Sequence, residues 1–138
     1  MSGVTYALFS AVAAAVTAIL AKIGVEGVPS NLAYAIRTVV VIVFAWLMVF
    51  IAGEQHKLGT VSRRSLLFLA LSGLATGLSW LAYFRALQLS PASRVAPIDK
   101  LSLPLTVILA ALFLGESISW RLGIGVTLMT IGALLTIS

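Results

Sequence analysis

An acid and a base stand side by side within one long apolar stretch of this chain. Asp99 and Lys100 fall inside the segment from about residue 91 to residue 114, roughly a dozen ångströms from its start if that segment is helical. Pro97 and Pro104 flank them, and each proline removes one helix hydrogen bond, so that the carbonyl of Lys100 loses its donor at Pro104. We therefore expect a kinked or locally unwound helix lining a water-filled cavity, with Asp99 as the candidate proton or counter-ion site.

Three further cations are expected in the same half of the membrane. Arg37 lies in the first two turns of one apolar segment, Arg85 lies near the end of the next, and Lys22 ends the first. Arg85 is a better partner for Asp99 than Lys100 is, because adjacent residues point about 100° apart on a helix. This charge pattern predicts a pocket for an anionic or zwitterionic metabolite. The structural alternative is an Asp99–Arg85 or Asp99–Lys100 pair, with Arg37 reaching toward the lipid headgroups.

An aromatic residue, Trp80, is a further candidate for lining this pocket. Trp80 shares one helical face with Phe84 and Leu87. Such a face is more often used for packing between helices than for lining a solute path. Both interpretations of Trp80 stay open.

Several kinds of chemistry are excluded by what the sequence lacks. There is no cysteine, and the one histidine, His56, lies alone in a polar stretch, so no metal site is expected. No glycine-rich phosphate loop and no Ser/His/Asp set is present, so we expect neither an enzyme nor a cofactor. The Lys and Arg residues are scattered singly apart from Arg63 and Arg64, a pattern of loop and interface anchors rather than of nucleic acid binding.

The composition requires lipid as the solvent of this chain. Of its 138 residues, 61% are hydrophobic and 9% are charged, whereas a soluble domain carries about 25% charged residues. A helix needs about 20 apolar residues to cross the hydrocarbon core, and five segments meet that requirement. We predict an all-α protein of the cell (inner) membrane, surrounded by the lipid bilayer, with a single five-helix domain over residues 1–138. The predicted helices cover about residues 4–21, 31–52, 65–89, 91–114 and 119–137.

Glycine pairs mark two helix faces where close packing is expected. Gly73 and Gly77 form a GxxxG face in the third segment, and Gly125 and Gly132 lie seven residues apart in the fifth. Glycine lets another backbone approach closely, so each pair predicts a helix contact.

The ends of the fourth segment carry their own signals. Ser90 and Pro91 are typical of an N-cap followed by the first helical residue. Gly115 is typical of a helix stop.

Charges near the helix ends give only a weak preference for one orientation. Loops alone count four cations against two, which favours a cytoplasmic N-terminus, and two arginines that can snorkel outward make the count four against four. Such a balance is compatible with insertion in both orientations. On one side are Lys57, Arg63, Arg64 and Arg121, and on the other are Lys22 and Arg94, joined by Arg37 and Arg85.

Two stretches of this chain are similar to a known family of membrane proteins. They are ALQLSPASRVAPIDKLS at residues 86–102 and LFLGE at residues 112–116. The opening, with KIG at 22–24, Pro29 and AIR at 35–37, is similar as well. The chain resembles, over essentially its whole length, the EamA domain of the drug/metabolite transporter superfamily, and in particular its small single-domain bacterial and archaeal group. Residues 95–102 and the Leu-Gly-Glu ending are the most specific parts of this likeness.

The resemblance implies a carrier that moves small organic solutes by alternating access. Larger relatives have two five-helix repeats of opposite orientation, so one repeat implies an antiparallel homodimer, with a parallel dimer or a partner from another gene as alternatives. Pro104 is an addition to the family pattern. The first segment also lacks the essential Glu of the small four-helix multidrug relatives, which leaves Asp99 as the well-placed acid if protons are coupled. The alternative function is a non-transporting accessory subunit of a larger complex.

Overall fold

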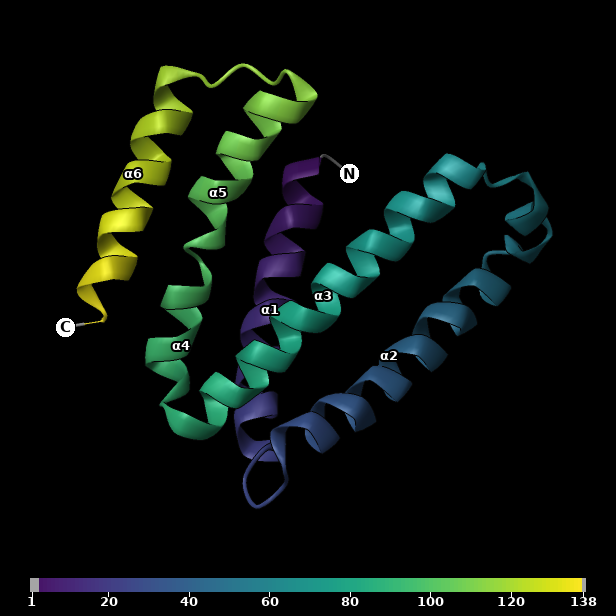
Figure 1. The fold of residues 1–138 in the computed structure, drawn as a ribbon, viewed down its shortest axis with the longest axis horizontal. Coiled ribbons are helices and arrows are strands. Elements are labelled where there is room, and N and C mark those ends of the chain that lie inside the picture. The colour runs from purple at the N-terminus through teal and green to yellow at the C-terminus, as the bar shows by residue number, and fades with distance from the viewer. Residues whose placement is uncertain (1–2, 138) are drawn as a thin grey trace. The chain divides into compact units, whose positions relative to one another are not determined.

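The computed structural model describes residues 3–137, and these fold into helices without a strand among them (Figure 1). The all-helical prediction is confirmed. In chain order the elements are α1 (Gly3–Gly24), α2 (Ser30–Ile51), the short 3-10 helix η1 (Gln55–Thr60), α3 (Arg63–Leu89), α4 (Ala92–Asp99), α5 (Ser102–Leu109), the π-helical η2 (Ala110–Leu114) and α6 (Trp120–Leu135).

Four helical stretches among the described residues are long and apolar enough to cross a membrane. They are α1, α2, α3 and the stretch Ala92–Leu114, which combines α4, α5 and η2. The apolar helix α6 has 16 residues and is shorter than these four. Its length is about 24 Å, below the roughly 30 Å of the hydrocarbon core. A fifth crossing through α6 therefore stays a prediction.

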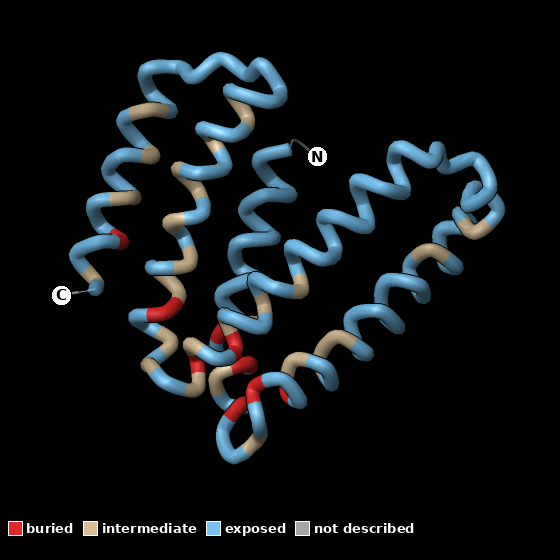
Figure 2. The backbone as a smooth tube through the Cα atoms, in the orientation of Figure 1, coloured by how far each residue is buried: buried red, intermediate tan, exposed pale blue. Residues whose placement is uncertain are grey.

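The described chain divides into two compact units. Unit 1 contains residues 3–19 and 89–137, and unit 2 contains residues 20–88. In unit 1, α6 packs beside α4 and α5, as Figure 1 shows. In unit 2, the buried residues gather where the end of α1, the start of α2 and the end of α3 meet (Figure 2). Those residues are Ala21, Val25, Ser30, Ala33, Phe84 and Leu87.

The helices expose large apolar side chains along most of their length. Val40 on α2 is 65% exposed and Leu78 on α3 is 71% exposed, and they are typical of their helices. Water would make such a surface a strong site of aggregation, because monomeric soluble proteins rarely expose apolar patches of this extent. The same surface is stable against lipid, where the helices satisfy their own backbone hydrogen bonds.

The fourth segment begins one residue later than the sequence indicates. Pro91 itself is the N-cap, with φ −61° and ψ 142°, and its carbonyl accepts the N–H groups of Arg94 and Val95 at 3.0 and 3.1 Å. Ala92, rather than Pro91, is thus the first helical residue. The expected cap at Ser90 is wrong by one position, because an extended ψ at Pro91 keeps it outside the helix.

A left-handed glycine ends η2. Gly115 has φ 69°, and the N–H of Glu116 reaches back to the carbonyl of Ala110 at 3.3 Å. Gly115→Ala should lower the free energy of unfolding by about 1 kcal/mol, because a Cβ is strained in this conformation. Denaturant unfolding in detergent, followed by tryptophan fluorescence, measures the loss.

A matched control for Gly115→Ala is available in α1. Gly24 is the last residue of that helix, has no positive φ, and has open space around a built Cβ. Gly24→Ala should therefore leave the stability unchanged or slightly raised. Equal losses in the two variants would show that the left-handed backbone is not the cause.

Candidate functional site

A guanidinium stacked on an indole joins α2 to α3 within unit 2. The Cζ atom of Arg37 lies 3.7 Å from the ring centroid of Trp80. Arg37 is seven residues after Ser30, so it stands about 10 Å along α2. A desolvated contact of this kind contributes about 2 kcal/mol, whereas an unpaired cation at the bilayer centre costs about 3 kcal/mol or more.

Arg37 lacks an acidic partner in the part of the chain that the structure describes. No carboxylate among residues 3–137 lies within ion-pairing distance of its guanidinium. The ring of Trp80 covers one face of the guanidinium, while the N–H groups around its edge point outward in the plane. Those N–H groups match the two oxygens of a carboxylate or phosphate. The geometry therefore leaves an anion-binding edge inside a membrane-length helix.

Aromatic rings surround this stack. Tyr34 precedes Arg37 by three residues on α2 and meets Phe84 edge to face at 5.9 Å between centroids. Trp80 contacts the rings of Tyr83 and Phe84 at 5.3 and 6.1 Å. The ring of Trp80 both packs on its own helix and contacts Arg37, and its place in a solute path stays a prediction.

One of the four glycines expected at helix contacts meets a neighbouring helix in the described structure. A Cβ on Gly77 would lie 3.7 Å from the hydroxyl of Tyr34, so the small residue makes room for that ring. Gly73, Gly125 and Gly132 have no atom within 4 Å of a built Cβ. The helix surface at these three glycines is therefore not covered by another part of the described chain.

Two hydrogen bonds tie the end of α3 to the loop between α1 and α2. The Lys22 ammonium donates to the carbonyl of Leu87 at 2.6 Å, and the Gln88 amide donates to the carbonyl of Val28 at 2.7 Å. In a continuing helix the carbonyl of Leu87 would accept from residue 91, which is a proline without an N–H. Lys22 supplies the missing donor.

Arg85 is held within its own helix. Its Nη1 donates to Oε1 of Gln88 at 3.0 Å, and its side chain is exposed. Because Gln88 also bonds to Val28, Arg85 is connected through one side chain to the loop between α1 and α2.

In unit 1 the fourth segment is interrupted between the two prolines. Pro97 lies inside α4, the helix stops at Asp99, and α5 begins at Ser102. The carbonyl of Lys100, expected to lack a donor, accepts the N–H of Leu103 at 3.0 Å. Pro104 is the third residue of α5, where an N–H has no partner within the helix in any case. Pro104 therefore costs α5 no hydrogen bond, contrary to the expectation from the sequence.

The ion pair that Asp99 makes is with its neighbour. Nζ of Lys100 lies 3.2 Å from Oδ2 of Asp99, and the two side chains are 53% and 38% exposed. The sequence favoured an Asp99–Arg85 pair over this one. Lys100 is the C-cap of α4 and keeps a helical backbone, with φ −70° and ψ −7°, so the two side chains leave the helix about 100° apart and the long lysine chain bridges that separation.

Tyr34 and Gln88 are contacts that sequence reasoning did not identify. Tyr34 lies three residues before Arg37, a spacing that places both on one helix face and could have indicated it. Gln88 gave no such signal. Among the described residues, no group of three or more His, Cys, Asp or Glu side chains could hold a metal ion.

The apolar helices are long enough to cross a membrane, so the chain is a polytopic membrane protein. Two of these helical stretches carry charged side chains: one is interrupted at the Asp99–Lys100 ion pair, and another carries the Arg37 guanidinium without an acidic partner among the described residues. The chain belongs to the EamA-like transporter family, which matches it over residues 1–138. It is a multi-pass membrane transporter, a class that carries small solutes across the bilayer. The family points to a transporter rather than an enzyme.

A curated relative supports this assignment. It is a Sinorhizobium sp. protein named "Uncharacterized transporter in cobO 3'region", which is 50% identical to this chain over 130 residues. The aligned part covers 94% of this chain and 92% of the relative. No solved structure matches the chain.

Proposed function

We propose that this transporter moves a small organic solute bearing a carboxylate or phosphate across the cell inner membrane by alternating access, as an antiparallel homodimer. The observation that carries this proposal is the Arg37–Trp80 stack. A permanent cation with no acidic partner in the described chain requires an anion to offset its cost in the bilayer. The solute supplies that anion, and its release leaves Arg37 resting on the ring of Trp80.

Asp99 and Lys100 have a different role in the proposal. Their ion pair sits where the helix is interrupted, and both side chains are accessible. Interrupted helices at membrane depth line cavities, and a carboxylate there can exchange a proton for a solute. Protons are therefore the proposed coupling ion. Arg85, exposed and held by Gln88, is the remaining cation of the proposed binding set.

The homodimer is proposed because one chain contains few helices. A carrier needs an enclosed path and a gate on each side, and a single set of about five helices is too small for both. The relative has nearly the same length, because 130 aligned residues make up 92% of it. The open faces at Gly73, Gly125 and Gly132 suit close contact with the helices of a second copy.

Tryptophan fluorescence tests the anion site with simple carboxylates and inorganic phosphate as probes. Trp46→Phe and Trp120→Phe together leave Trp80 as the one tryptophan. The probes should change its emission in a saturable manner, because an anion that draws Arg37 away uncovers the ring. Arg37→Gln should abolish the response, and Arg37→Lys should weaken binding about tenfold because lysine lacks the planar fork.

The matched control is a second arginine–aromatic contact. Cζ of Arg64 lies 5.9 Å from the ring of Phe68 at the start of α3, away from Trp80 along the same helix. Arg64→Gln should leave the titration unchanged. A response to neutral amide or alcohol analogues, or a full response in Arg37→Gln, would contradict the proposed site.

A further inference from the structure

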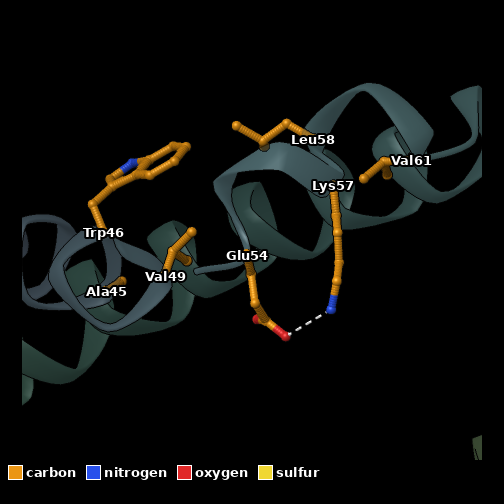
Figure 3. A pocket seen from close by; sticks show the side chains of 7 residues that line it. All are labelled: Ala45, Trp46, Val49, Glu54, Lys57, Leu58 and Val61. Carbon is orange, nitrogen blue, oxygen red and sulfur yellow. Dashed lines mark hydrogen bonds and ion pairs between the residues drawn. The ribbon is translucent and has the colours of Figure 1, made fainter. Parts of the chain in front are cut away.

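A pocket of about 290 Å³ lies at the end of unit 2 where α2 gives way to η1 (Figure 3). Its apolar wall comes from Ala45, Trp46 and Val49 on α2 and from Leu58 and Val61 beyond it. Its charged part comes from Glu54 and Lys57. None of these residues belongs to the proposed solute site.

This pocket falls where α2 is expected to leave the membrane. The 22 residues of α2 extend about 33 Å, close to the thickness of the hydrocarbon core, so Ile51 stands near the water boundary. Trp46 lies just below that boundary and is 44% exposed, as interfacial tryptophans commonly are. Glu54 and Lys57 lie beyond it. The pocket thus has one side at the level of lipid chains and the other at the level of headgroups.

The charged part of the pocket is an accessible pair of opposite charges. Nζ of Lys57 lies 3.4 Å from Oε1 of Glu54, and the two side chains are 71% and 55% exposed. Figure 3 shows both extending to the same side, with their charged ends meeting, while Trp46 and Leu58 lie on the other side. The net charge of the Glu54–Lys57 pair is zero. A ligand that complements it carries one negative and one positive group close together.

We propose that this pocket binds the headgroup of phosphatidylethanolamine. The Lys57 ammonium takes the phosphate, and the Glu54 carboxylate accepts hydrogen bonds from the ethanolamine ammonium. The glycerol and the first methylenes of the lipid lie against Trp46, Val49 and Leu58. Phosphatidylcholine fits less well because its quaternary ammonium has no N–H, and phosphatidylglycerol fits less well because nothing in it offsets Glu54.

Native mass spectrometry of the purified protein, with each of the three lipids at equal concentration, tests the proposal. Wild type should retain phosphatidylethanolamine about two- to fivefold more than either of the others, the upper part of the range for exposed charge pairs. Lys57→Gln should remove the preference. Glu54→Gln should remove the advantage over phosphatidylcholine and raise the retention of phosphatidylglycerol.

Two variants serve as controls. Arg63→Gln removes a neighbouring cation that does not line the pocket and should keep the wild-type preference. The swapped variant Glu54→Lys with Lys57→Glu restores a neutral pair and should recover the preference for phosphatidylethanolamine. Equal retention of all three lipids by wild type, or higher retention of phosphatidylglycerol, overturns the proposal, and so does an equal loss in Arg63→Gln. Denaturant unfolding in detergent, followed by tryptophan fluorescence, reports separately whether each variant keeps its fold.

Discussion

Replacing Asp99 with asparagine is expected to abolish solute flux in reconstituted vesicles, while the protein still inserts and dimerises. The change leaves the Lys100 ammonium, 3.2 Å away, without its counter-charge at the point where the helix is interrupted. Because both side chains are partly exposed, the lost ion pair itself contributes little. The larger effect is that asparagine cannot carry a proton, and losing a positioned proton-transfer group lowers a rate by about a hundredfold or more. The measurement is the initial rate of uptake of the anion that changes Trp80 emission. Lys100→Ala should have an equally large effect.

The controls for this prediction are charge changes outside the interrupted helix. Glu116→Gln removes an exposed acid that follows η2, and Arg121→Gln removes an exposed base near the start of α6. Both variants should transport at close to the wild-type rate. A proton gradient should also accelerate wild-type flux, whereas any flux that remains in Asp99→Asn should no longer respond to it. Normal transport by Asp99→Asn and Lys100→Ala would assign the ion pair a structural role only.

About half of the molecules carrying Thr60→Cys are expected to react with a membrane-impermeant thiol reagent applied to intact cells. The natural chain has no cysteine, so this change creates a single labelling site. Thr60 is the exposed last residue of η1, and its hydroxyl donates only to the carbonyl of Lys57, so the substitution is mild. The expected result follows from an antiparallel homodimer, which presents η1 on both sides of the membrane.

Glu26→Cys is the matched site at the other end of α2. Glu26 is exposed in the loop between α1 and α2. Two orientations predict partial labelling at both sites, rising to completion after permeabilisation. One fixed orientation predicts full labelling at one site and none at the other. That outcome would falsify the inverted homodimer, and a second protein would have to supply the opposite half.

The helical class and much of the element plan could be predicted because they depend on composition and local signals. Runs of apolar residues long enough to cross a bilayer have few other folds available. Gly115 ends its segment because a left-handed residue after a helix favours glycine whatever surrounds it. The length of α6 could not be read in the same way, since its apolar pattern continues past Leu135, where the helix stops.

The contacts of the site were less accessible to sequence reasoning, because they depend on how helices rotate and where they are interrupted. Arg37 and Trp80 were both chosen from the sequence, but their stacking depends on the relative placement of α2 and α3. The Asp99–Lys100 pair depends on the rotamer of the long Lys100 side chain, which the 100° spacing of adjacent residues does not fix. Pro104 was expected to disturb the chain, yet a new helix starts two residues before it and accommodates it without loss.

The hydrogen bonds of Lys22 and Gln88 to the carbonyls of Leu87 and Val28 anchor one end of α3 in unit 2. They fix the end of α3 against the loop between α1 and α2. From Leu87 back to Arg63 the arm is about 36 Å long, and a rotation of about 5° displaces its far end by about 3 Å. Because Pro91 has no N–H, the carbonyl of Leu87 is left for Lys22, so any tilt of α3 that keeps this bond would be largest at its η1 end.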